Sequence, residues 1–130
     1  REMSKWVEKA CFDGDSGRVF VDSDESYGQN KPPAIYGADG ARFVPDLFAQ
    51  RDSTSGVIIG EAETSVSLES RHTRDQFVTF MRNCLKEKDS LFVVAVPWVS
   101  ASRARSIVSD IQRRNNMCHG EVVVLDRLRG

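Results

Sequence analysis

Residues 91–98 form a continuous apolar run, Leu-Phe-Val-Val-Ala-Val-Pro-Trp. This is an ordinary strand length, and it falls far short of the roughly 20 residues that a helix needs to cross a bilayer. A strand without polar positions has to be covered on both faces, which is typical of strands inside a parallel or mixed sheet flanked by helices. The run therefore predicts a layered fold around a central sheet.

Two segments on either side of this run have the 3.6-residue apolar period of amphipathic helices. They cover residues 70–88 and residues 100–115. The predicted buried positions are Phe77, Phe80, Met81, Cys84 and Leu85 in the first segment and Ala104, Ile107, Val108 and Ile111 in the second. A third helix is predicted over residues 2–11, from the helical spacing of Met3, Trp6, Val7 and Ala10.

Further strands are predicted over residues 41–50, 56–64 and 121–126. Pro45 inside the first of these predicts an edge strand or a bulge, because proline cannot donate to a sheet ladder. Residues 12–40 are rich in Gly, Asp, Ser and Pro, and we expect a loop-rich insertion with one or two short strands. The predicted order is α-β-β-β-α-β-α-β, an α/β domain over residues 1–130 with a mixed β-sheet and flanking helices.

Composition limits the classes of protein that fit. The three cysteines are widely spaced, which favours reduced thiols in a cytoplasmic protein over a disulfide framework or a zinc site. No segment resembles a signal peptide or a membrane span, so no membrane partner is expected. Charge is uneven: residues 1–65 carry seven Lys and Arg against twelve Asp and Glu (net −5), and residues 66–130 carry eleven against seven (net +4). This asymmetry is compatible with an enzyme acting on phosphates, although most such charge is solvated surface.

Three carboxylates are predicted to meet where two strands pair. Asp46 follows Pro45, and Glu61 and Glu63 end the apolar run that begins at residue 57. Side chains alternate along a strand, so Glu61 and Glu63 share one face and Ala62 points to the other. If residues 41–50 and 56–64 form a hairpin, Asp46 joins the same patch. Such a group of oxygen donors suits Mg²⁺ or Mn²⁺, because carboxylates that close repel unless a cation or a proton compensates them.

Each of these residues also has an ordinary structural interpretation. Asp46 after a proline is a common turn residue. Glu61 and Glu63 would equally suit the solvent face of an edge strand. Taken singly, these interpretations are favoured; the functional one depends on the residues acting together.

The order of elements, Pro45-Asp46 and Gly60-Glu61-Ala62-Glu63-Thr64 together resemble the PD-(D/E)XK nuclease superfamily, which has the restriction-endonuclease-like fold. The resemblance covers about residues 1–126, although residues 12–40 match no part of it. It implies that Asp46, Glu61 and the backbone carbonyl of Ala62 bind Mg²⁺ or Mn²⁺. It also implies an acidic ligand from the first helix, for which Glu8 or Glu2 is available.

A glutamine with an aromatic residue four positions later is found on the helix after the motif in the recombination-type branch of this family. Gln76 and Phe80 have that spacing, and residues four apart share a helix face. Gln76 is therefore a candidate catalytic residue beside Asp46 and Glu61. Arg71 and Arg74, on the same helix, are candidates for contacts with nucleic-acid phosphates.

One departure from the family pattern concerns the lysine, whose position Glu63 occupies. The loss removes a positive charge where negative charge develops in the transition state. Glu63 could act as a base or a further metal contact, a basic residue such as Arg71, His72 or Arg74 could replace the lysine, or catalysis could have been lost. The sequence leaves these three outcomes open.

The predicted function is metal-dependent phosphodiester hydrolysis of nucleic acid, with DNA as the first expectation. The alternatives are a catalytically inactive nuclease-like module that binds DNA or a protein partner, and an unrelated small α/β binding domain. Because many members of the family are dimers, a homodimer is one expected assembly. Trp6 and Trp98 are interpreted as core or rim residues rather than as base-stacking platforms.

Overall fold

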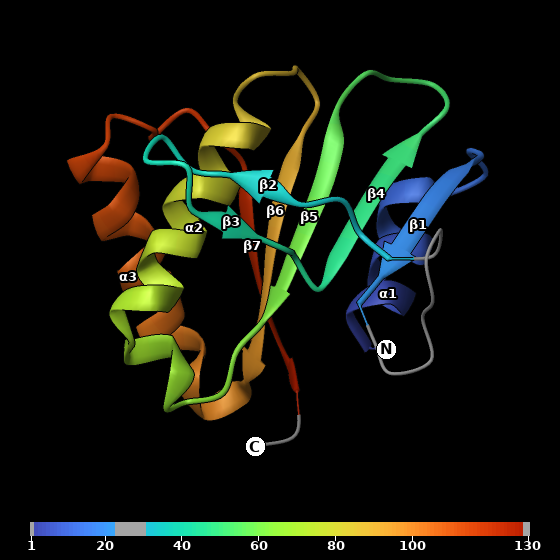
Figure 1. Cartoon of the computed structure of the whole chain (residues 1–130). Helices are drawn as coiled ribbons and strands as arrows, with labels where there is room; N and C mark the ends of the chain where they lie inside the picture. Colours follow the sequence, from blue (N-terminus) through green and yellow to red (C-terminus); the bar gives the residue numbers. More distant parts are fainter. Residues whose placement is uncertain (1, 23–30, 129–130) are drawn as a thin grey trace.

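The computed structural model describes residues 2–22 and 31–128 (Figure 1). Its centre is a five-stranded sheet in the order β1-β4-β5-β6-β7, with a separate two-stranded sheet, β2-β3. The strands are β1 (Gly17–Val21), β2 (Ile35–Tyr36), β3 (Arg42–Phe43), β4 (Leu47–Arg51), β5 (Val57–Ala62), β6 (Leu91–Pro97) and β7 (Val122–Leu128). The helices are α1 (Glu2–Val7), which continues as a π-helix (Glu8–Phe12), α2 (Arg71–Cys84) and α3 (Ala101–Arg114). Two single 3-10 turns, Ser67–Glu69 and Trp98–Ser100, precede α2 and α3.

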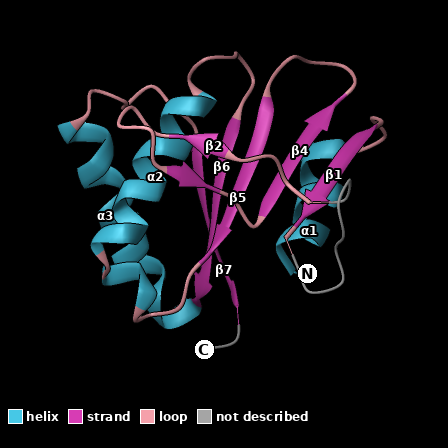
Figure 2. Cartoon of the chain, viewed as in Figure 1, coloured by secondary structure: helices cyan, strands magenta, loops and turns pink. Residues whose placement is uncertain are grey.

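The main sheet is mixed. β1, β4 and β5 are antiparallel neighbours, and β5, β6 and β7 are parallel. The hairpin predicted between residues 41–50 and 56–64 is confirmed as β4-β5, in which Leu47 pairs with Gly60. α2 connects β5 to β6 and α3 connects β6 to β7, and both helices lie on one face of the sheet while α1 lies on the other (Figure 2).

Each face of the sheet has its own hydrophobic core. On the α2/α3 face, the rings of Phe77 and Phe92 pack edge to face with their centroids 5.3 Å apart. On the α1 face, Met3 and Val7 pack among residues of β4 to β7. Neighbouring residues of β6 belong to different cores, since Val94 lies in the first and Val93 in the second. The strand predicted to be covered on both faces is therefore confirmed.

α1 approaches the sheet closely at one glycine. A Cβ atom at Gly60 would lie only 2.7 Å from the sulfur of Met3 and 3.2 Å from the Cβ of Leu47. The first turn of α1 therefore rests on β5 directly before Glu61. This contact fixes the helix against the α1 face at the carboxyl end of β5.

The predicted α/β class, mixed sheet and flanking helices are confirmed, whereas the predicted order of elements is matched only in part. The strand expected over residues 41–50 is divided into β3 and β4, and β2 pairs with β3 outside the main sheet. The prediction of an edge strand or bulge from Pro45 was wrong: Pro45 precedes β4, which lies between β1 and β5. A proline ahead of a strand removes no ladder hydrogen bond, so an inner strand can follow it.

The two-sided burial of β6 is tested by Val93→Thr and Val94→Thr. Each change keeps the side-chain shape and buries an unpaired hydroxyl, so each should lower the free energy of unfolding by about 1–3 kcal/mol. Val66→Thr, at an exposed position, should change it by less than about 0.5 kcal/mol. Urea unfolding followed by circular dichroism measures all three. A neutral effect of either β6 change would contradict burial on that face.

Candidate functional site

Asp46, Glu61 and Glu63 come together on the α2/α3 face of the sheet. Asp46 directly precedes β4, and the pairing of Leu47 with Gly60 brings it beside Glu61. Leu47 and Ala62 belong to the core on the α1 side. Asp46 is the neighbour of Leu47, and Glu61 and Glu63 flank Ala62. Because side chains alternate along strands, these three carboxylates point to the opposite face, toward α2 and α3.

Asp46 and Glu61 are joined by two crossed hydrogen bonds. The backbone N–H of Asp46 donates to Oε1 of Glu61 over 2.9 Å, and the backbone N–H of Ala62 donates to Oδ2 of Asp46 over 2.8 Å. The carbonyl of Asp46 also accepts from the N–H of Asp22 over 2.9 Å. Each carboxylate is therefore held against the backbone of the partner strand, and the geometry depends on the hairpin register.

Glu63 is held from the neighbouring strand and from α2. Its backbone N–H donates to the carbonyl of Ala95 on β6 over 2.9 Å. The hydroxyl of Thr73 donates to Oε1 of Glu63 over 3.1 Å, and the hydroxyl of Ser70 donates to that of Thr73 over 3.0 Å. Ser70 is the N-cap of α2, since its side chain also accepts from the N–H of Thr73. The start of α2 therefore positions the Glu63 carboxylate.

Burial and like charge together perturb this group. Only 4% of Glu61 and 7% of Glu63 is exposed. Burial, with the negative charge of Asp46 and a hydrogen bond to Glu63, raises the pKa of Glu61 to about 10. Burial also raises the pKa of Asp46, against the lowering effect of the Ala62 N–H. The cluster therefore holds a proton at neutral pH, which is what buried carboxylates require when no cation compensates them.

Gln76 and Phe80 lie on the buried side of α2. Phe80 is fully buried, and its ring lies 6.3 Å from that of Phe43. Gln76 is half-buried, and within the described residues its side chain makes no recorded hydrogen bond to the carboxylates. Thr73, one turn earlier, makes the contact that was expected of Gln76. Thr73 was not among the residues predicted for the site; its position four residues before Phe77 was the available signal that it faces the sheet.

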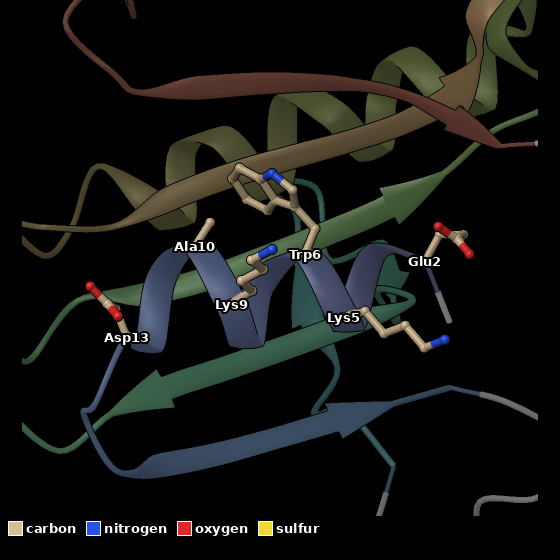
Figure 3. A pocket seen from close by; sticks show the side chains of 6 residues that line it. All are labelled: Glu2, Lys5, Trp6, Lys9, Ala10 and Asp13. Carbon is tan, nitrogen blue, oxygen red and sulfur yellow. The ribbon is translucent and has the colours of Figure 1, made fainter.

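Glu8 is exposed on the π-helix that follows α1. It lies five residues beyond Met3, about 7.5 Å further along the helix from the contact with Gly60. Figure 3 shows Glu2 at the opposite end of the helix from Asp13, near the arrowhead of β5. An acidic residue at position 2 is therefore closer to the carboxylate end of β5 than Glu8 is.

A separate open hollow of about 650 Å³ lies along this helix. Its lining comes from residues 2–13 alone and includes Trp6, Lys5 and Lys9 (Figure 3). None of the three clustered carboxylates lines it. The hollow and the carboxylate cluster are therefore different features of the molecule.

The two arginines predicted to contact nucleic acid have different surroundings. Arg71, the first residue of α2, is exposed, and no ion pair to it is found within residues 2–22 and 31–128. Arg74 pairs with Asp110 of α3 over 3.3 Å, and Asp110 also pairs with Arg113 and Arg114. Arg71 is therefore available to a ligand, whereas Arg74 links the two helices.

The carboxylate cluster fits a divalent cation in donor chemistry, because all its side-chain donors are oxygens and its like charges need compensation. In the described part of the chain, no three His, Cys, Asp or Glu side chains are already arranged as a metal-ligand group. Asp46 and Glu61 instead accept hydrogen bonds from backbone N–H groups. Binding an ion would therefore require both carboxylates to turn from these donors and the cluster to lose its proton.

Comparison of the chain with protein-family models, with curated proteins and with solved structures found no match. Among the described residues, no helix combines the length and the apolar character needed to cross a membrane.

The support of Glu63 by α2 is tested by Thr73→Val. The change leaves a buried carboxylate without its hydroxyl donor and should lower the free energy of unfolding by about 1–3 kcal/mol. Thr73→Ser keeps the donor and should cost less. Thr79→Val, at a half-buried position later on α2, is the matched control. Equal stabilities of Thr73→Val and Thr79→Val in urea unfolding would show that the contact does not support Glu63.

Proposed function

We propose that this chain is a metal-dependent nuclease of the PD-(D/E)XK type, which hydrolyses phosphodiester bonds of nucleic acid, with DNA as the expected substrate. The crossed hydrogen bonds between Asp46 and the Glu61–Ala62 segment support this most directly. They bring the two acidic positions of the motif together across a hairpin, as the motif requires. The mixed sheet with helices on both faces is compatible with the restriction-endonuclease-like fold that the motif implies.

In this proposal Asp46 and Glu61 would hold Mg²⁺ or Mn²⁺, with the carbonyl of Ala62 as a further donor; α1, which carries Glu2 and Glu8, packs on the opposite face of the sheet. When bound, the ion supplies Lewis-acid chemistry: it polarises the phosphate and lowers the pKa of water. The raised pKa of Glu61 means that loading the site displaces a proton. Before binding, a proton would therefore offset part of the negative charge of Asp46 and Glu61, and after binding the cation would offset it instead.

Glu63 would accept a proton from the attacking water, with Thr73 fixing one carboxylate oxygen. Burial beneath the start of α2 keeps this carboxylate out of bulk water. Arg71, exposed two residues before Thr73, would contact a substrate phosphate and supply part of the positive charge that the missing lysine would have given. These roles give each charged group near the cluster a part in binding the phosphate or moving a proton.

One observation favours the alternative of a catalytically inactive nuclease-like module. Asp46 and Glu61 each accept a hydrogen bond from a backbone N–H, and the pKa of Glu61 is raised, so part of the negative charge of the cluster is offset without an ion. Such a module would bind nucleic acid or a protein partner without cutting. A homodimer and a cytoplasmic location stay predictions under either function.

The proposal is tested by cleavage of supercoiled plasmid and of single-stranded DNA with Mg²⁺ or Mn²⁺. We expect metal-dependent cutting that Asp46→Asn lowers at least about 100-fold; this change keeps an acceptor for the Ala62 N–H but removes the charge. Asp75→Asn, at an exposed position of α2, should leave the rate unchanged.

Glu63→Lys separates the two functions. Loss of cutting in this variant, with an active parent, assigns Glu63 a catalytic part. Cutting that appears only in Glu63→Lys would mean that the site lost its activity with its lysine. If neither protein cuts either substrate, hydrolysis of these DNAs is refuted, and the two binding alternatives, an inactive nuclease-like module and an unrelated α/β binding domain, are the ones to test next.

A further inference from the structure

Exposed apolar residues follow the two strands at the end of the sheet where the carboxylate cluster lies. Four large hydrophobic residues of the described chain are strongly exposed: Tyr36, Val66, Trp98 and Val99. Val66 follows β5, and Trp98 and Val99 follow β6, so these three lie at the carboxyl ends of two parallel neighbouring strands. Their exposed fractions are 85%, 73% and 64%. We call Val66, Trp98 and Val99 the apolar platform.

The platform is tied to the site through two hydrogen bonds. Glu63 donates its N–H to Ala95, and three residues of chain span at most about 11 Å, so Trp98 starts close to Glu63. The hydroxyls of Ser65 and Ser100 lie 2.6 Å apart and join the loop that carries Val66 to the turn that carries Trp98. The platform and the carboxylates therefore belong to one end of the sheet.

The size of the platform argues for a small occupant. A large aromatic side chain covers roughly 150–250 Å². One such residue and two valines fall well below the roughly 800 Å² that each partner buries in a stable protein–protein interface. A flat exposed indole of this size matches the face of one nucleic-acid base.

One exposed cation at this end of the sheet, Arg71, is available to a phosphate. Arg71 is exposed at the start of α2 and pairs with no carboxylate among the described residues. Glu69, which lies between Val66 and Arg71 in the chain, forms a two-point ion pair with Arg103, with distances of 2.7 and 2.8 Å. The negative charge of Glu69 is thereby compensated, and this ion pair holds the segment before Arg71 beside the start of α3, which follows Trp98 and Val99. Arg71 would therefore contact phosphates of a strand whose base stacks on Trp98.

We propose that Trp98, flanked by Val66 and Val99, is a stacking site for an unpaired base, and that the nucleic acid presented to the carboxylates is single-stranded. The assignment of the neighbouring carboxylates as the reacting centre rests on the proposed function. Bases within a duplex already stack on each other, so only an unpaired or extruded base can offer its face to the indole.

The test uses Trp6→Phe, in which Trp98 is the sole tryptophan. Titration with single-stranded oligothymidylate in EDTA should quench its fluorescence, whereas a blunt duplex of equal length should quench it much less. An oligonucleotide of abasic sugar-phosphate units should bind without quenching. In the parent chain, Trp98→Ala should raise the Kd for oligothymidylate roughly 5- to 150-fold. Tyr36→Ala, which removes an exposed aromatic of β2, is the matched control and should leave Kd unchanged.

Three results would each overturn the proposal. The first is an unchanged Kd for oligothymidylate in Trp98→Ala, and the second is equal quenching by duplex and single strand. The third is a dimer of the parent, seen by sedimentation, that Trp98→Ala converts to monomer, since the platform would then be an interface between copies. Cleavage assays separate this inference from the proposed function. If the parent cuts DNA but Trp98→Ala does not change its Kd, the stacking proposal is refuted and the nuclease proposal is not. If binding depends on Trp98 but the parent does not cut, the stacking proposal is supported and the nuclease proposal is refuted.

Discussion

The structure of this end of the molecule depends on the burial of carboxylates at the end of a hairpin. Glu61 and Glu63 are almost fully buried, and Asp46 lies across the hairpin from Glu61. Such a group is stable only because backbone N–H groups, the Thr73 hydroxyl and a retained proton offset its negative charge. A chain that keeps this arrangement accepts an electrostatic cost that neutral residues would avoid, which is the argument for a functional site.

The topology supplies what this burial needs. β5 and β6 are parallel, so their carboxyl ends and the starts of α2 and α3 meet at one end of the sheet. α2 brings Thr73 to Glu63, and the turn before α3 brings Trp98 close to the same carboxylate. On the other face, Met3 rests on Gly60 and closes the sheet behind the site. The groups proposed to bind and to react therefore lie where two crossover connections begin.

Local pattern was sufficient to predict most of the fold and the core of the site. The unbroken apolar run over residues 91–98 predicted β6. The alternation of side chains along a strand, with the expected pairing of residues 41–50 and 56–64, predicted that Asp46, Glu61 and Glu63 lie together. The features that the sequence did not predict depend on contacts between residues that are far apart in the chain. The bond from Thr73 to Glu63 and the ion pair from Arg74 to Asp110 depend on how α2 packs on its neighbours. Trp98 was expected in the core or at its rim, but it lies one residue past the last buried position of β6, where pattern does not determine burial.

In the proposed function, a proton on the carboxylate cluster occupies the place of a divalent cation. Isothermal titration calorimetry with Mn²⁺ at pH 7, repeated in buffers of different ionisation enthalpy, counts the protons released on binding. Because the pKa of Glu61 is about 10, we expect release of about one proton per bound ion. Absence of binding, or binding without proton release, would contradict it.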